Sequence, residues 1–210
     1  MPSITPSPSE LPLLTTIASL DQATVKFFQN QYPDYDEHAS EFPLWIDGVD
    51  TTYAPFIPTS VRRVLLALEM ARISPTDKVL DVGSGDGRFC YAAVKLFGAQ
   101  AALGIECEQD LVDKSTELAT DLVQEGRVSF QVADLATWRD MASMQSKEWT
   151  VIIVYLSPEG GDDLCQWIQQ EFKRGVRIVA LVFDMKHLDG LHCSFEDSQE
   201  GIWIYEKPKN

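Results

Sequence analysis

The chain has 210 residues, 45% of them hydrophobic, with a formal net charge of −15 at pH 7 and a sequence pI of about 4.5. This length suits one α/β domain with an N-terminal extension, and the acidity argues against nucleic-acid binding through a broad basic surface. The charge is compatible with a basic protein substrate that is steered electrostatically, although it can also serve solubility alone.

The cysteines and histidines form no ligand motif. Four cysteines are widely spaced, without a Cys-x-x-Cys pair, so we expect no metal site and reduced thiols in a reducing compartment. The longest apolar runs have the length of a strand, which predicts no membrane span, and no presequence is recognisable. We therefore expect a cytoplasmic location, with nuclear and mitochondrial locations left open. The sequence leaves the oligomeric state open, and we favour a monomer.

The N-terminal part divides into three stretches. Residues 1–12 are rich in Pro and Ser and predict a disordered tail. Residues 13–60 are expected to form an extension, with apolar residues at helical spacing in 13–31 and an irregular aromatic and acidic stretch over 32–50. That stretch could form a lid over a cofactor, line a substrate groove, or simply cover a sheet edge. The main domain is expected over 61–210.

The extension ends in a rigid segment that leads into a helix. Pro55 and Pro58 fix their own φ angles and bias the preceding residues toward extended geometry. Thr59 or Ser60 can then cap a helix over 61–71, whose apolar residues recur at helical spacing.

Residues 78–88 organise the chain. They read Lys78-Val-Leu-Asp-Val-Gly-Ser-Gly-Asp-Gly-Arg88, an apolar strand over 78–82 that turns on three alternating glycines. Residues 89–97 then have a helical pattern. Strand, glycine turn and helix predict the nucleotide-binding start of a doubly wound α/β fold, and the glycines allow the backbone to approach a ligand closely.

The charges around this turn discriminate between ligands. A dinucleotide would place its pyrophosphate on the amides that open the helix, but Asp81 before the turn and Asp86 within it would repel a pyrophosphate, and Arg88 is the positive residue nearby. The spacing Gly-x-Gly-x-Gly also differs from the dinucleotide pattern. Two carboxylates suit a ligand with a cationic end and no phosphate, such as S-adenosylmethionine (SAM), which carries a sulfonium and an α-ammonium group.

Two further acids end predicted strands. The strand over 101–106 ends in Glu106, and the strand over 128–134 ends in Asp134. Open α/β sheets bind ligands at the carboxyl ends of their strands, so we expect Glu106 to accept hydrogen bonds from the ribose hydroxyls and Asp134 to accept one from the adenine amino group. Each acid alone could be a solvated loop carboxylate, but their placement at successive strand ends favours a SAM site.

The second half of the chain completes the predicted sheet. Residues 149–155 form a continuous apolar run, as a central parallel strand should, and lead into Leu156-Ser-Pro-Glu159. The other predicted elements are helices at 110–122, 140–147 and 161–173, a strand at 176–183 and a terminal hairpin at 192–196 and 201–206.

These motifs resemble known families. Asp81-Val-Gly-Ser-Gly-Asp-Gly87, Glu106 and Asp134 resemble the SAM-binding motifs of class I methyltransferases. More narrowly, Tyr53-Ala-Pro-Phe-Ile-Pro-Thr-Ser60 and the helix after it resemble the protein-lysine methyltransferases that modify the c subunit of ATP synthase and adenine nucleotide translocase. The resemblance implies a Rossmann-like fold with helices on both faces of a seven-stranded sheet of order 3-2-1-4-5-7-6, in which strand 7 is antiparallel.

The resemblance also implies a set of site residues. The expected SAM-binding residues are Thr59, Ser60, Asp81, Gly83, Ser84, Gly85, Gly87, Glu106, Asp134 and Leu135. A lysine acceptor requires an apolar or aromatic channel with a few hydrogen-bond acceptors, for which Tyr53, Tyr155 and Ser157 are candidates; each aromatic could instead belong to the core.

The expected function is methyl transfer from SAM to a protein amino group, in particular lysine. The Asn-Pro-Pro-Tyr motif of methylases that act on amino groups of nucleic acids and glutamine is absent after residue 155, which counts against those substrates. A small-molecule methyltransferase is the alternative within the same class. A SAM-binding module without catalysis, which presents an acidic surface to a partner, is the alternative from another class.

Overall fold

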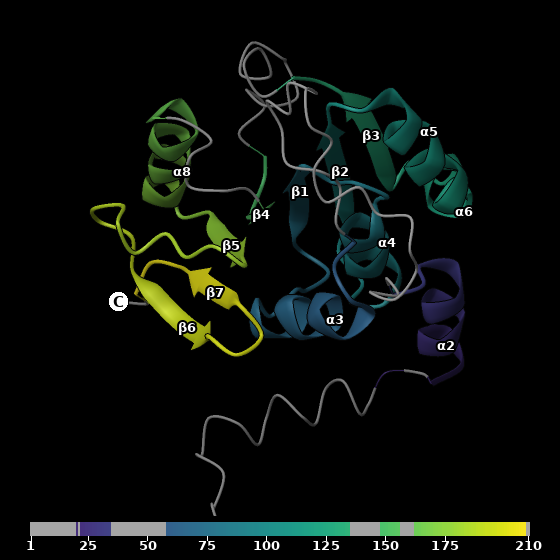
Figure 1. The fold of residues 1–210 in the computed structure, drawn as a ribbon, viewed down its shortest axis with the longest axis horizontal. Coiled ribbons are helices and arrows are strands. Elements are labelled where there is room, and N and C mark those ends of the chain that lie inside the picture. Colours follow the sequence, from purple (N-terminus) through teal and green to yellow (C-terminus); the bar gives the residue numbers. More distant parts are fainter. Residues whose placement is uncertain (1–19, 21, 35–57, 135–147, 156–161, 209–210) are drawn as a thin grey trace, which may run out of the picture.

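The structure, a computed structural model, describes residues 20, 22–34, 58–134, 148–155 and 162–208 (Figure 1). Seven strands form one sheet: β1 Lys78–Val82, β2 Ala101–Glu106, β3 Val128–Val132, β4 Val151–Val154, β5 Arg177–Leu181, β6 Cys193–Asp197 and β7 Ile202–Tyr205. The spatial order is β3-β2-β1-β4-β5-β7-β6, and β7 runs antiparallel to both β5 and β6. The expected sheet order and strand direction are therefore confirmed.

The described helices match most of the predicted ones. They are α2 Gln22–Gln31, α3 Val61–Met70, α4 Arg88–Lys95, α5 Gln109–Leu118, α6 Thr120–Gln124 and α8 Asp162–Arg174. The prediction of one helix over 110–122 is wrong, because the chain leaves helical geometry at Ala119 (φ −100°, ψ 23°). At this break the Thr120 hydroxyl donates to the Glu117 carbonyl, one of the local side-chain bonds that compete with a continuous helix. The helix predicted over 140–147 lies outside the described residues.

Alternate residues of the central strands face two separate cores. Val79, Ile153 and Val179 pack with the apolar faces of α3 and α4 on one side of the sheet. Leu80 and Ile152 pack with residues of α8 on the other side. Both faces of the central strands are therefore buried, which explains why these strands are mostly apolar in sequence.

Part of the N-terminal extension belongs to the first of these cores. Phe28 of α2 and Tyr32 just after it have no exposed surface. Their rings lie 5.0 Å apart, and the Tyr91 ring of α4 lies 6.0 Å from Phe28 and 5.5 Å from Tyr32. Residues 22–34 are thus packed on the α4 side of the sheet, next to the element that follows the glycine turn.

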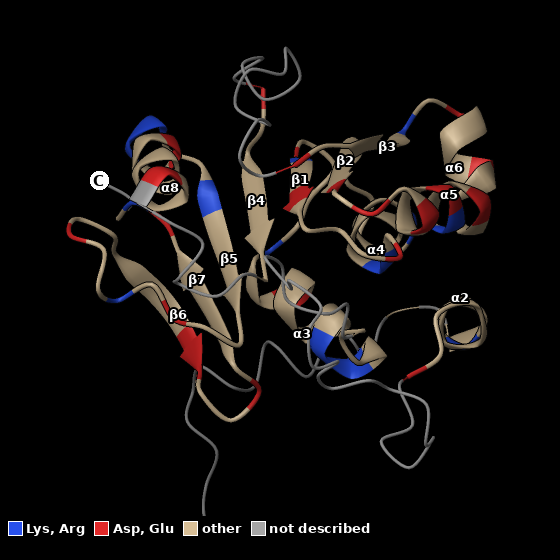
Figure 2. Ribbon diagram, turned by 45° about the horizontal axis from the view of Figure 1, so that its top comes forward, with Lys and Arg blue, Asp and Glu red and all other residues tan. Residues whose placement is uncertain are grey.

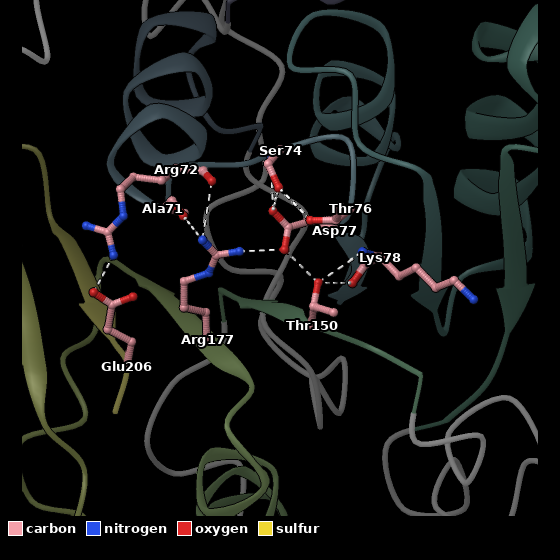
Figure 3. Close-up of polar contacts among 9 residues, drawn as sticks. All are labelled: Ala71, Arg72, Ser74, Thr76, Asp77, Lys78, Thr150, Arg177 and Glu206. Atoms are coloured by element: carbon pink, nitrogen blue, oxygen red, sulfur yellow. Dashed lines mark hydrogen bonds and ion pairs between the residues drawn. The ribbon is translucent and has the colours of Figure 1, made fainter. Parts of the chain in front are cut away.

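A polar network joins the end of α3 to the amino ends of the central strands (Figure 3). The Arg177 guanidinium donates to Asp77 Oδ1 at 2.6 Å and to the Ala71 carbonyl at 2.6 Å. Burial would raise the pKa of Asp77, but hydrogen bonds from Thr150 and Ser74 and the charge of Arg177 outweigh it and hold the pKa below its usual value. This network fixes α3 relative to β1, β4 and β5.

The same edge of the sheet carries a pocket of about 290 Å³. Two of the cations that line it are already paired within the chain, Arg72 with Glu206 and Arg177 with Asp77. The pocket lies at the amino ends of the parallel strands, whereas open α/β sheets bind their ligands at the carboxyl ends. We therefore assign this pocket to the support of the fold and expect the functional site at the opposite edge.

Candidate cofactor site at the carboxyl edge of the sheet

The glycine turn at the carboxyl end of β1 has a backbone that favours glycine. Gly83, Gly85 and Gly87 have φ angles of 78°, 53° and 80°, in the left-handed region. The Gly83 and Ser84 amides donate to the Ile105 carbonyl at 2.8 and 3.0 Å, which holds the turn against β2. A Cβ atom on Gly87 would lie 2.6 Å from the Phe130 ring, so this position also requires glycine for space.

Glu106 connects the end of β2 to the glycine turn. Its side chain accepts a hydrogen bond from the Gly85 amide on Oε2 at 2.9 Å, and bonds from the Cys107 and Glu108 amides on Oε1 at 2.8 and 3.2 Å. The Cys107 thiol also donates to Oε1 at 3.2 Å. A carboxylate has about two acceptor positions on each oxygen, so Oε2, which takes only the Gly85 amide among the described residues, keeps about one position for a ligand. The sequence predicts the ribose contact of Glu106 but not this second role in shaping the turn.

Asp81 is a buried carboxylate with an unsatisfied oxygen. It is 3% exposed, and Oδ2 has no hydrogen-bond partner among the described residues. Burial raises its pKa to about 8, and the nearby charges of Glu106 and Asp86 act in the same direction. Ser84 Oγ is also buried and has no hydrogen-bond partner among the described residues. Because an unpaired buried carboxylate is costly, this pair of groups suits a ligand that brings a cation or a donor.

Asp86 is not available to a ligand in the way that the sequence suggests. Arg88 binds it through both carboxylate oxygens, from Nε to Oδ1 at 2.9 Å and from Nη2 to Oδ2 at 2.7 Å. Both side chains are 4% exposed. The expectation that two carboxylates face a cationic ligand is therefore corrected: Asp81 is unpaired within the described chain, and Asp86 is neutralised by its neighbour.

The segment before α3 reaches the same region. Ser60 caps α3 by accepting a hydrogen bond from the Arg63 amide at 3.3 Å. Thr59 is 6% exposed, and its carbonyl accepts a hydrogen bond from Arg88. The capping prediction is confirmed, and the structure brings Thr59 to the glycine turn.

The remaining predicted residues divide between described and undescribed segments. Asp134 is exposed and follows Ala133, whose amide donates to the Glu106 carbonyl at 2.9 Å, so it lies at the carboxyl edge as expected. Tyr155 directly follows β4 and is half-buried; burial raises the pKa of its hydroxyl, against a smaller lowering by Arg63, so the hydroxyl stays neutral at pH 7. Tyr53, Leu135 and Ser157 lie outside the described residues.

The charge is unevenly distributed over the described surface. Acidic positions dominate α5, α6 and β6, whereas basic ones occur on α3 and at the end of α8 (Figure 2). None of the helices in the described part of the chain combines the length and apolarity needed to cross a membrane.

The chain is similar in sequence to known methyltransferases. The family model described as "ANTKMT methyltransferase domain" matches residues 81–191, just over half of the chain. A protein-lysine N-methyltransferase of Saccharolobus islandicus (strain REY15A) is 27% identical over 134 residues, which cover 64% of this chain and 80% of that protein. A lysine N-methyltransferase of the ATP synthase C subunit from Rattus norvegicus is 26% identical over 152 residues, covering 72% of this chain and 66% of that protein, slightly under two thirds.

Solved structures share the fold. An RNA methyltransferase from Salinibacter ruber in complex with S-adenosyl-L-homocysteine is 29% identical, with a TM-score of 0.56, and the match covers 73% of this chain and 98% of that one. A structure described as MtNAS in complex with MTA and tNA is 14% identical, with a TM-score of 0.51, and covers 70% of this chain and 61% of that one. The second likeness concerns the fold alone.

Proposed function

Since the chain belongs to the ANTKMT methyltransferase family, we propose that it transfers the methyl group of SAM to a lysine side chain of a protein. The family membership and the S-adenosylhomocysteine-bound relative establish a SAM-dependent methyltransferase. The protein-lysine acceptor is supported by the names of the archaeal and rat relatives.

The observation that carries the cofactor site is the buried Asp81 carboxylate. Its Oδ2 has no hydrogen-bond partner in the described part of the chain, and the α-ammonium of SAM would supply one. The cation would also stabilise the charged form of Asp81, which burial disfavours. We place the ribose at the acceptor position that remains on Glu106, and the adenine amino group near Asp134. In this arrangement the amides of the glycine turn line the cofactor without side chains in between.

SAM supplies an activated methyl group, so the protein mainly has to align and desolvate the acceptor. A lysine with an ordinary pKa of about 10.4 is charged at neutral pH and must lose its proton before it can attack. Desolvation lowers the pKa of an amine, and an aromatic wall provides such an environment. We propose Tyr155 for this wall, with its neutral hydroxyl as one acceptor, and we keep Tyr53 and Ser157 as candidates from the sequence.

The similarity to an RNA methyltransferase makes RNA the second candidate acceptor. A net charge of −15 opposes it, because RNA binding draws on cationic side chains that neutralise phosphates. The same charge favours a basic protein segment. A small-molecule acceptor is the third candidate.

A labelling experiment separates these candidates. The full chain is incubated with SAM labelled in its methyl group and a host extract, and samples are then treated with protease or with ribonuclease. We expect protease-sensitive label that is recovered as methyl-lysine after acid hydrolysis. Label that is released by ribonuclease would show RNA as the acceptor, and label in small molecules would support the third candidate. Label in no product would contradict the proposed methyl transfer.

A further inference from the structure

Arg88, the first residue of α4, is a buried guanidinium whose charge is matched within the chain. It engages both oxygens of Asp86, two residues earlier, in the fork geometry that arginine forms with carboxylates. This arrangement leaves Arg88 without a free positive charge for a ligand carboxylate, so its role has to come from its other contacts.

These other contacts reach two segments that are distant in the sequence. Nη1 donates to the Thr59 carbonyl, and Nη2 lies 3.5 Å from the Pro33 carbonyl. The Arg88 guanidinium also lies 5.9 Å from the centre of the Tyr32 ring. Because both acceptors are backbone carbonyls, Arg88 fixes where the two segments run, whatever side chains they carry.

A separate hydrogen bond joins the same two segments to each other. Asp34 Oδ1 accepts the amide of Val61, the first residue of α3, at 2.6 Å. The glycine turn, residues 32–34 and residues 59–61 are therefore held as one unit at the carboxyl edge. Glu106 approaches the turn from the β2 side. Arg88 binds the Thr59 carbonyl directly and also binds Asp86, whose charge acts on Asp81.

We propose that Arg88 is a positioning residue for the amino-acid end of SAM: it holds the Thr59 segment against the glycine turn and so sets the wall around that end of the cofactor. The inference rests on the proposed location of SAM, with its ammonium at Asp81 and its ribose at Glu106. The nucleoside end is then held independently of Arg88, by side chains of β2 and the segment after β3.

The opposing explanation is that Arg88 only stabilises the turn as a whole. Two ligands distinguish these roles, because S-adenosylhomocysteine carries the amino-acid group and 5′-methylthioadenosine has the same nucleoside without it. Calorimetry with both ligands is applied to the wild type and to Arg88→Lys, which keeps the charge but loses the planar fork. A second variant, Asp86→Leu with Arg88→Met, replaces the buried pair by apolar side chains, a change that folds tolerate better than the loss of one partner. Arg62→Met, which removes an exposed arginine of α3 paired with Glu200, is the matched control.

Both test variants are expected to bind S-adenosylhomocysteine roughly tenfold more weakly or worse, the effect of one well-placed hydrogen bond, and 5′-methylthioadenosine within about twofold of the wild type. The control should match the wild type with both ligands. Equal losses for the two ligands, or an unchanged affinity for S-adenosylhomocysteine in a folded variant, would overturn the inference. A wild-type protein that binds neither ligand would overturn the proposed cofactor site and this inference with it.

Discussion

Replacement of Glu106 tests the residue that joins the end of β2 to the glycine turn and carries the proposed ribose contact. Glu106→Ala removes the acceptor of three backbone amides, those of Gly85, Cys107 and Glu108, together with the proposed ribose contact. Hydrogen bonds to charged groups contribute roughly 1.5–3 kcal/mol each, so the loss of one ribose bond should weaken S-adenosylhomocysteine binding about 10- to 150-fold. Loss of the three amide bonds should also lower the free energy of unfolding by about 2–4 kcal/mol, since the freed amides at the turn can partly be hydrated.

Glu106→Gln separates the two effects. Its carbonyl oxygen can still accept the Cys107 and Glu108 amides, whereas its NH₂ group cannot accept from the Gly85 amide, so it should lose less stability than Glu106→Ala but a similar part of the affinity. Glu108→Ala is the control, because it removes an exposed acid two residues away that makes no side-chain cap. Calorimetry gives the affinity and urea titration gives the stability. A folded Glu106→Ala protein that binds like the wild type would refute the assignment of Glu106 to the ribose.

Three further predictions concern charge and backbone geometry. The pKa of Asp81 is about 8 in the folded protein and near 4 in the unfolded chain, so this group should lower the stability of the ligand-free protein as pH rises from 4 to 8, with no further change above pH 8. Thermal melts of Asp81→Asn should lack this pH-dependent loss. An identical pH profile for the wild type and the variant would contradict the prediction. In urea titrations, Gly87→Ala should destabilise the fold by about 2 kcal/mol or more, because its φ is 80° and the new Cβ would meet the Phe130 ring. Gly126→Ala, with a φ of 70° and no neighbour within 4 Å, should show only the backbone cost of about 1 kcal/mol. Equal losses would mean that the Phe130 ring moves aside freely. Val182 is a β-branched residue at φ 64°, so Val182→Gly should raise the free energy of unfolding by about 0.5–1 kcal/mol, and a loss of stability would show that its side-chain contacts outweigh the strain.

The parts of the fold that depend on local pattern could be predicted. The strand over 78–82 and the strand over 101–106 have the predicted bounds, because short runs of mostly apolar residues between turn residues identify buried parallel strands. The break between α5 and α6 could not, since it arises at an alanine, which by itself favours a helix.

Long-range contacts explain what the sequence does not reveal about the candidate site. Arg88 binds carbonyls 29 and 55 residues away. Because every residue has a backbone carbonyl, these contacts do not restrict the residue types at the two positions and cannot be recognised in the sequence. The Asp-Gly-Arg spacing at 86–88 is a local signal for the ion pair, but a cationic ligand explains Asp86 equally well in the sequence alone. Glu106 is identified by its place at a strand end, whereas its three amide contacts depend on the actual path of the turn.

Hydrogen exchange with and without S-adenosylhomocysteine tests the location of the cofactor site most directly. We expect the ligand to add protection to the amides of residues 83–88 and 105–108, the glycine turn and the end of β2, and to leave exchange around Arg177 at the amino edge unchanged. Added protection confined to the pocket that Arg72 and Arg177 line, with none in the glycine turn, would contradict the placement of the site at the carboxyl edge.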